Sequence, residues 1–176
     1  MSTVIEAIKK RSSTRGYTSQ PLTEKELSTL IEAGLQAPTA TNRQELHFTV
    51  LKDGHPLLQE LEEEKNRLRE IVNPPHNFYY EAPTVVIISA ERSFKWSSVD
   101  AGIAVENMAL AAQGLGLGNV IIGCIDDALK GEKQDYFSKV LDFPEGYEYK
   151  IAIAFGHKAA DKEPHTYDAG VQVTFL

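Results

Sequence analysis

The chain has 176 residues, of which 42% are hydrophobic and 24% are charged, and this composition is that of one globular domain over residues 1–176. Its net charge of −7 disfavours nucleic acid and anionic membranes as partners, because both require a basic binding face. The single cysteine, Cys124, excludes an internal disulfide. We expect neither a secretory leader nor a transmembrane segment, and therefore a cytoplasmic protein.

The first half of the chain predicts three helices and a strand. Apolar spacing places one helix over residues 3–10 and a second after a capping box, Thr23 to Glu26. Residues 47–51 predict a short strand. Residues 56–72 predict a third helix, which ends at the pair Pro74-Pro75.

The second half predicts the centre of a sheet. Residues 84–90 form a continuous apolar run, which is typical of a strand that is covered on both faces. Residues 119–125 repeat this pattern, and residues 147–155 alternate between large and small or charged side chains. These three segments predict the core strands of a sheet that helices flank.

The helix predicted over residues 99–113 is apolar almost all the way round, since Asp100 and Glu106 are its only charges. Such a helix must be buried, and a small domain has difficulty enclosing it completely. We therefore predict that part of its surface meets a second subunit; the central helix of a monomer is the alternative. The strand-like tail, residues 170–176, follows a polar stretch and predicts an exchanged segment that packs on the partner.

Three other patterns do not indicate function. The glycines at 114, 116 and 118 follow a helix and precede a strand, which reverses the order of a dinucleotide-binding fingerprint. The five histidines lack metal-ligand spacing, so we expect no metal site. No Gly-x-Ser-x-Gly sequence is present, and Cys124 is expected to be a buried small hydrophobic residue in its strand.

Two polar clusters near the N-terminus indicate a binding site. The first is Arg11-Ser12-Ser13-Thr14-Arg15, and the second is Ala37-Pro38-Thr39-Ala40-Thr41-Asn42-Arg43-Gln44. Guanidinium groups and hydroxyls beside a turn that offers backbone amides are suited to holding the phosphate of a cofactor. The alternative is that they are ordinary helix ends, in which arginines complement the helix dipole and hydroxyls bind free carbonyls.

These clusters resemble those of the flavin-dependent nitroreductases, which carry Arg-x-Ser-x-Arg and then Ala-Pro-Ser-x-x-Asn-x-Gln-Pro-Trp. The resemblance extends over nearly the whole chain, through residues 100–108, 114–118, 122–123 and 154–156. It implies a nitroreductase-like α+β fold with a central mixed β-sheet flanked by helices, built as an intertwined homodimer. The flavin sites of this family lie at the dimer interface.

The resemblance also implies roles for residues around FMN. Arg11, Ser12 and Ser13 would hold the phosphate, and Arg15 would face the pyrimidine edge and stabilise the negative charge that reduction places at N1. The cofactor-binding residues of the second cluster would be Pro38, Thr39, Ala40, Asn42 and Gln44. Of these, Thr39 and Ala40 would contact the cofactor from the other subunit, and Asn42 would fix the loop or touch the ring. The backbone at Ile122 and Gly123 would approach N5 and O4. Lys158 and Lys162 are the candidates for a further phosphate contact, since the arginine usual there is missing.

One departure from the family sequence concerns the wall of the site. Where relatives continue Gln-Pro-Trp, this chain has Gln44-Glu45-Leu46, so the wall near the interface is altered. Residues 56–80 are expected to cover the flavin, with Phe78, Tyr79 and Tyr80 as apolar surfaces; the alternative is that each of these aromatic residues belongs to the core. Trp96 could also be such a surface, but the core is the preferred interpretation for it.

The resemblance implies an NAD(P)H-dependent FMN oxidoreductase that reduces nitroaromatics, quinones or similar electron-poor acceptors in a ping-pong cycle. NADH and NADPH are not distinguished, and no side chain is assigned as catalytic because the chemistry belongs to FMN. Three alternatives stay open. They are a flavin-dependent dehalogenase-type reductase, a flavin-binding or storage module without efficient turnover, and a dimeric structural protein without flavin.

Overall fold

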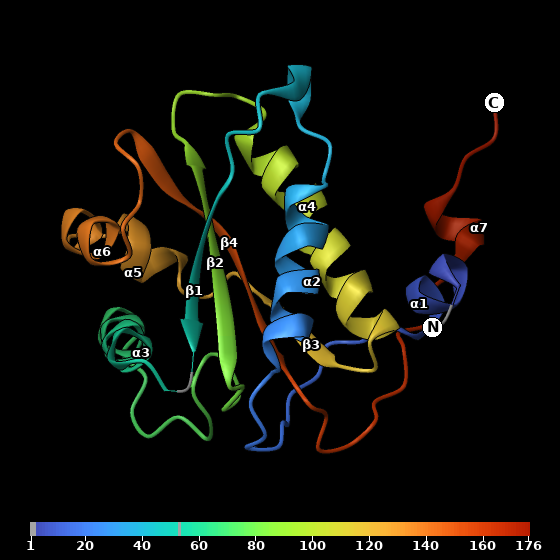
Figure 1. Ribbon diagram of the computed structural model, residues 1–176, viewed down its shortest axis with the longest axis horizontal. Coiled ribbons are helices and arrows are strands. Elements are labelled where there is room, and N and C mark those ends of the chain that lie inside the picture. The colour runs from blue at the N-terminus through green and yellow to red at the C-terminus, as the bar shows by residue number, and fades with distance from the viewer. Residues whose placement is uncertain (1–2, 53) are drawn as a thin grey trace.

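The structure is a computed structural model and describes residues 3–52 and 54–176. Its four strands form one sheet between two layers of helices (Figure 1). In chain order the elements are α1 (Val4–Lys10), α2 (Glu24–Leu35), the 3₁₀ turn η1 (Ala40–Asn42), β1 (His47–Lys52), α3 (Pro56–Leu68), β2 (Thr84–Glu91), α4 (Ser97–Gly114), β3 (Gly118–Ile122), α5 (Asp126–Lys130), α6 (Gln134–Val140), β4 (Tyr147–Gly156) and α7 (Ala169–Gln172).

The strand order is β1-β2-β4-β3, and every neighbouring pair of these strands is antiparallel. The predicted mixed sheet is therefore wrong for the named strands. β2 and β3 run in the same direction, but β4 lies between them and runs the opposite way. Within the described ranges, parallel pairing is confined to an isolated bridge between Ser13 and Asn119.

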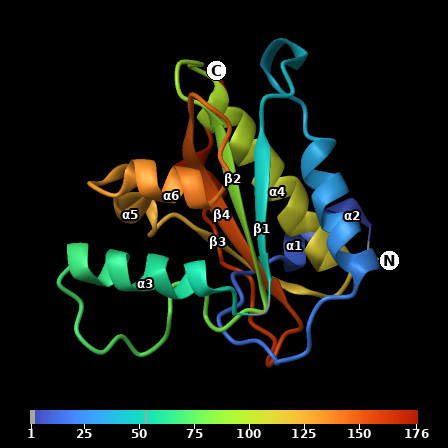
Figure 2. The ribbon, with the colours of Figure 1, turned by 60° about the vertical axis from the view of Figure 1, so that its left-hand side comes forward.

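The sheet separates two hydrophobic cores. Val85 and Ile87 of β2 face the core that α3, α5 and α6 cover, whereas Val86 and Ile88 face the core beneath α2 and α4. Figure 2 shows α3 and α6 on one side of the sheet and α2 with α4 on the other. Because successive side chains of a strand point to opposite faces, burial on both faces requires an unbroken apolar run. This explains the sequence of β2.

Most predicted boundaries are close to the observed ones. The strands predicted over 47–51, 84–90 and 147–155 are confirmed as β1, β2 and β4, and the predicted capping box of α2 is present. The strand predicted over 119–125 ends at Ile122, because the following residues form a turn into α5. The helix predicted over 56–72 ends at Leu68, and Glu70 has a left-handed backbone that cannot continue it.

The helix α4 is longer than predicted and is not buried on every side of this chain. Ala104, Met108 and Ala112 are fully buried beneath α2 and the sheet, whereas Val99 is 51% and Ile103 37% exposed. The neighbouring helix α1 also exposes apolar residues, namely Val4, Ile5 and Ile8. One chain therefore leaves an apolar surface on these two helices, which we call the α1–α4 face.

The C-terminal tail forms no strand within its own chain, and its predicted exchange with a partner stays a prediction. Residues 169–172 form the short helix α7, and residues 173–176 are neither helical nor paired. A strand needs a neighbouring strand to accept its backbone hydrogen bonds, and this tail has none within the described parts of its own chain. All residues from 165 to 176 are exposed, including Phe175 and Leu176.

Candidate functional site

A basic pocket of about 510 Å³ lies where α1 meets the C-terminal segment. It brings together Arg11, Ser12, Ser13 and Arg15 with Lys162, five of the residues that the sequence singled out. Its remaining lining comes from residues 163–166. Sequence reasoning missed these four, because a polar tail without periodicity carries no signal of where it folds back. We call this cavity the basic pocket.

The arginine-serine segment is held against the start of β3. The backbone N–H of Thr14 donates to the carbonyl of Asn119 at 2.8 Å, next to the bridge between Ser13 and Asn119. A Cβ atom at Gly118 would lie 2.8 Å from the Thr14 side chain, a distance that real Cβ contacts do not reach. Glycine at this position therefore allows the segment to approach the sheet closely, which fixes the position of the pocket wall.

The donors of the basic pocket are suited to an anion. Arg11 lies on the wall with its Nε 4.0 Å from the carboxylate of Glu106, and the Ser12 hydroxyl donates to the carbonyl of Lys162 at 3.0 Å. Each guanidinium has five N–H donors, so these contacts leave most of them free. The lining carries two guanidinium groups and a lysine against one carboxylate, Glu163, so it is locally positive in a chain of net charge −7, and the donor set fits a phosphate group.

The two lysines proposed from the sequence are not equivalent. Lys162 lines the basic pocket, whereas the ammonium of Lys158 lies 3.4 Å from the amide oxygen of Gln113 and 3.8 Å from Asp161. Lys158 therefore does not line the pocket; it ties the chain after β4 to the end of α4.

The second predicted cluster forms a loop at the N-terminal end of α4. The backbone N–H of Ala40 donates to both carboxylate oxygens of the buried Asp100, at 3.1 and 3.0 Å. The N–H of Gln44 donates to the Thr39 hydroxyl at 2.9 Å. Pro38 and Asn42 are exposed, and Asn42 has a left-handed backbone. Figure 1 shows this loop projecting at the top of the molecule.

The two clusters lie at opposite ends of α4 in a single chain. Asp100 is in the first turn of the helix, whereas the bridge from Ser13 to Asn119 lies beyond its last residue. At 1.5 Å per residue, the stretch from Asp100 to Gly114 is about 21 Å long. The residues Pro38, Thr39, Ala40, Asn42 and Gln44 are therefore not brought to the basic pocket of their own chain.

Ile122 and Gly123 lie at the far end of β3 from the basic pocket. The carbonyl of Ile122 accepts a hydrogen bond from the buried Tyr149 hydroxyl at 2.8 Å, so this end of the strand is anchored in the core. Gly123 is exposed, and a Cβ there would meet no atom within 4 Å. The backbone at this point is therefore open to a ligand. Cys124 lies just after the strand, half-buried, and burial raises the pKa of its thiol.

Glu45 occupies a buried position beside Asp100. The two residues are 7% and 2% exposed, and neither carboxyl oxygen of Glu45 has a hydrogen-bond partner among the described residues. Burial raises the pKa of Glu45 above its ordinary 4.5, and the adjacent Asp100 raises it further while Arg43 opposes the shift. Glu45, which stands where the family sequence has proline, therefore points into the protein beneath the loop of the second cluster.

The stability of the Glu45→Gln variant, measured relative to the wild type, should increase as the pH rises. A carboxyl whose pKa is raised on folding binds more protons in the native state, so the native state loses stability as the pH passes upward through the folded pKa. Glutamine removes this ionisation, so we expect the variant to be more stable than the wild type at pH 8 and little changed at pH 4. Urea unfolding at both pH values measures it.

The matched control is Glu26→Gln in the capping box of α2. Hydrogen bonds from Thr23 lower the pKa of Glu26, so this variant should lose stability at pH 8 and approach the wild type at low pH. If Glu45→Gln is stabilised equally at pH 4 and pH 8, the effect does not come from ionisation of the Glu45 carboxyl and the prediction is wrong.

The aromatic residues between α3 and α4 have different environments. Phe78 is 4% exposed and belongs to the core, whereas Tyr79 and Tyr80 are half-buried. Trp96 is 47% exposed, with the Lys95 ammonium 5.1 Å from its ring centroid, so the prediction that it is a core residue is wrong. It precedes α4 and lies at the surface of the described part of the chain.

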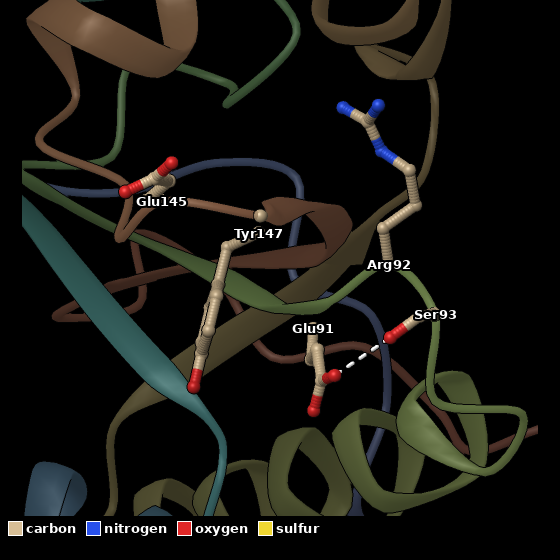
Figure 3. Close-up of a pocket in the computed structure, with 6 residues that line it drawn as sticks. Glu91, Arg92, Ser93, Glu145 and Tyr147 are labelled. Atoms are coloured by element: carbon tan, nitrogen blue, oxygen red, sulfur yellow. Dashed lines mark hydrogen bonds between the residues drawn. The ribbon is translucent and has the colours of Figure 1, made fainter.

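A second open hollow, of about 570 Å³, lies between the end of β2 and the start of β4 (Figure 3). Its Glu91 is already engaged, accepting from Ser93 at 2.6 Å and pairing with Arg43. Arg92 and Glu145 lie on opposite sides of the view in Figure 3, and Arg92 pairs with Glu148 at 3.2 Å. This hollow therefore has no convergent set of free polar groups.

Residues 3–52 and 54–176 contain no group of three or more His, Cys, Asp or Glu side chains arranged to hold a metal ion. No helix within these ranges combines the length and apolar character needed to cross a bilayer.

The fold and the pocket define an α+β protein with a four-stranded antiparallel sheet and a basic pocket at one end of β3. The sequence model of the Nitroreductase family matches residues 8–157, and the chain belongs to this family. A nitroreductase with bound FMN from Bacteroides fragilis is 30% identical and superposes with a TM-score of 0.88, covering 100% of both chains. A nitroreductase with bound FMN from Desulfitobacterium hafniense is 29% identical, with a TM-score of 0.89 over 100% of this chain and 99% of the other.

Among relatives by sequence, an FMN reductase (NAD(P)H) of Bacillus subtilis is 28% identical over 199 aligned residues. That alignment covers 100% of this chain and 76% of the relative.

Proposed function

We propose that the protein is an FMN-dependent oxidoreductase that uses NADH or NADPH to reduce nitroaromatic, quinone or similar electron-poor acceptors. The observation that carries the proposal is the basic pocket, in which two arginines, two serines and a lysine converge in a member of the nitroreductase family. The relatives named above as FMN reductase and as nitroreductases with bound FMN support the same cofactor.

Each part of the basic pocket has a role in this proposal. When bound, FMN supplies the site that accepts a hydride and passes it on. Arg11, Ser12 and Ser13 bind the phosphate, with the Arg11 guanidinium providing charge-assisted hydrogen bonds, and Lys162 adds a further positive charge. Arg15 places a fixed positive charge at the pyrimidine edge. The open backbone at Gly123 offers its N–H to the ring.

The complete site is proposed to need two chains. The loop Thr39–Gln44 lies at the N-terminal end of α4, and the basic pocket lies at its C-terminal end. A two-fold axis across α4 pairs the helices of two chains antiparallel, so the loop of one chain lies beside the basic pocket of its partner. The exposed apolar residues of the α1–α4 face support this arrangement, because burying them against a second copy removes them from water. The exposed tail, residues 165–176, is proposed to pack on the partner.

The acceptor is proposed to bind after the oxidised nicotinamide leaves, which gives ping-pong kinetics. The half-buried Tyr80, in contact with Arg15, offers apolar surface beside the basic pocket, and Trp96 offers an exposed ring near the loop of the other half-site. Flat electron-poor rings fit such surfaces.

The first experiment is the visible spectrum of the purified protein after supplementation with FMN and desalting. We expect a retained flavin band that bleaches when NADPH or NADH is added without oxygen, and the faster nucleotide names the donor. A retained band that neither nucleotide bleaches would favour a flavin-binding module without turnover. Absence of retained flavin would refute the proposed function.

A further inference from the structure

The segment between α3 and β2 contains a turn with many internal hydrogen bonds. The side-chain oxygen of Asn77 accepts from the backbone N–H groups of Tyr79, at 3.2 Å, and Glu81, at 3.0 Å. The N–H of Phe78 donates to the carboxylate of Glu62 on α3 at 2.8 Å, and the Phe78 ring is buried in the core. The turn is therefore fixed to the body of the protein at both its backbone and its central side chain.

Two successive residues of this turn have strained backbones. Tyr80 has a φ of 55° and Glu81 a φ of 59°, in the left-handed region that residues with a Cβ atom avoid. Strain of this kind persists where surrounding contacts hold it, and it concentrates at functional sites. In this turn the strained backbone directs the Tyr80 side chain toward Arg15, which lies 65 positions earlier in the chain.

Tyr80 makes two contacts with Arg15. The Nε–H of Arg15 donates to the Tyr80 hydroxyl at 3.3 Å, and the guanidinium carbon lies 5.7 Å from the centre of the tyrosine ring. The ring of His76 packs against Tyr80 with 4.2 Å between ring centres. Within residues 3–52 and 54–176 no carboxylate forms an ion pair with Arg15, so Tyr80 is the group that orients its guanidinium.

We propose that Tyr80 is a positioning residue that holds the Arg15 guanidinium at the rim of the basic pocket and thereby tunes the reduction of the bound flavin. The inference rests on the proposed function, in which Arg15 faces the pyrimidine edge. A neutral phenol orients a guanidinium without cancelling its charge, as a carboxylate would. The full positive charge therefore remains available to stabilise the negative charge that reduction adds to the ring.

The test compares Tyr80→Phe with Tyr79→Phe in the FMN-loaded protein. Tyr79 is a matched control, because it is the adjacent half-buried tyrosine and its hydroxyl has no hydrogen bond within the described ranges. Tyr80→Phe should make the flavin midpoint potential more negative and slow flavin reduction about three- to tenfold, the worth of one hydrogen bond. FMN affinity and the thermal unfolding midpoint should stay close to the wild type, and Tyr79→Phe should change neither potential nor rate.

A double-mutant cycle with Arg15→Gln shows whether Tyr80 acts through Arg15. In the Arg15→Gln protein, adding Tyr80→Phe should leave the potential unchanged. If instead the effects of the two substitutions add, Tyr80 acts independently and the proposal is overturned.

A second readout needs no cofactor. In the apo-protein, the Nε–H signal of Arg15, assigned by its loss in Arg15→Lys, should exchange with solvent faster in Tyr80→Phe than in the wild type or Tyr79→Phe. Equal exchange in all three would show that Tyr80 does not hold the guanidinium. If the wild type retains FMN and Tyr80→Phe has the same flavin potential and reduction rate, only this inference is overturned. A wild type that binds no FMN refutes the proposed function, and the exchange experiment still reports on the contact.

Discussion

The double variant Arg11→Ala/Arg15→Ala is expected to lose FMN on desalting, with an affinity at least about 100-fold below that of the wild type. Each charge-assisted hydrogen bond contributes about 1.5–3 kcal/mol, and the variant removes the guanidinium groups that carry several of them. Neither arginine contributes to the hydrophobic cores, so the fold should be retained. Equilibrium dialysis or fluorescence titration with FMN measures the affinity, and circular dichroism checks the fold.

The control for this variant is Lys9→Ala/Lys10→Ala. These lysines lie on the last turn of α1, immediately before Arg11, and their loss changes the net charge by the same amount. They do not line the basic pocket. Long-range attraction alone predicts equal losses of affinity in the two double variants, whereas a pocket that grips the phosphate predicts a loss confined to the arginine variant. Unchanged FMN affinity in Arg11→Ala/Arg15→Ala would remove the proposed cofactor site.

The second large effect is expected from Val99→Glu/Ile103→Glu on the exposed face of α4. Both side chains are on the surface of a single chain, so charges there should cost little in a folded monomer. In the proposed dimer they would bury four carboxylates against apolar surface, a cost that prevents association. We expect monomers in sedimentation velocity and a loss of FMN retention, because the loop Thr39–Gln44 of the partner would no longer reach the basic pocket.

A matched surface variant is Val72→Glu/Ile71→Glu. Both residues are exposed and apolar, but they follow α3 on the other side of the sheet. This variant should keep the oligomeric state and the FMN of the wild type. If the Val99→Glu/Ile103→Glu protein remains a dimer and retains as much FMN as the wild type, the dimer interface does not include this face of α4.

The fold could be predicted from the sequence wherever a periodic apolar pattern coincides with one element. The runs that became β2 and β4 are examples, because burial on both faces of a sheet leaves a continuous pattern. The direction of neighbouring strands could not be predicted in this way: nothing in the run 147–155 shows that it inserts between β2 and β3. The pairing of the tail could not be predicted for a related reason, since strand propensity does not provide a pairing partner, and its exchange with a second subunit stays a prediction.

The candidate site could likewise be predicted only where its residues are close together in the sequence. The arginines and serines of the basic pocket are contiguous in sequence, so their convergence follows from a single turn at the end of α1. The contribution of residues 163–166 depends on a return of the chain across 150 positions, for which no local pattern exists. The contact between Arg15 and Tyr80 is likewise set by a strained turn, which local propensity argues against.

The separation of the two clusters along α4 has a consequence for how the protein would behave at different concentrations. If each cofactor is shared between two chains, cofactor retention and subunit association are linked equilibria, and each must strengthen the other by the same factor. Dilution would then release FMN, and added FMN would restore dimers at concentrations where the apo-protein dissociates. A cell that makes little of this chain would hold it largely as inactive half-sites, so activity per chain would rise with expression level.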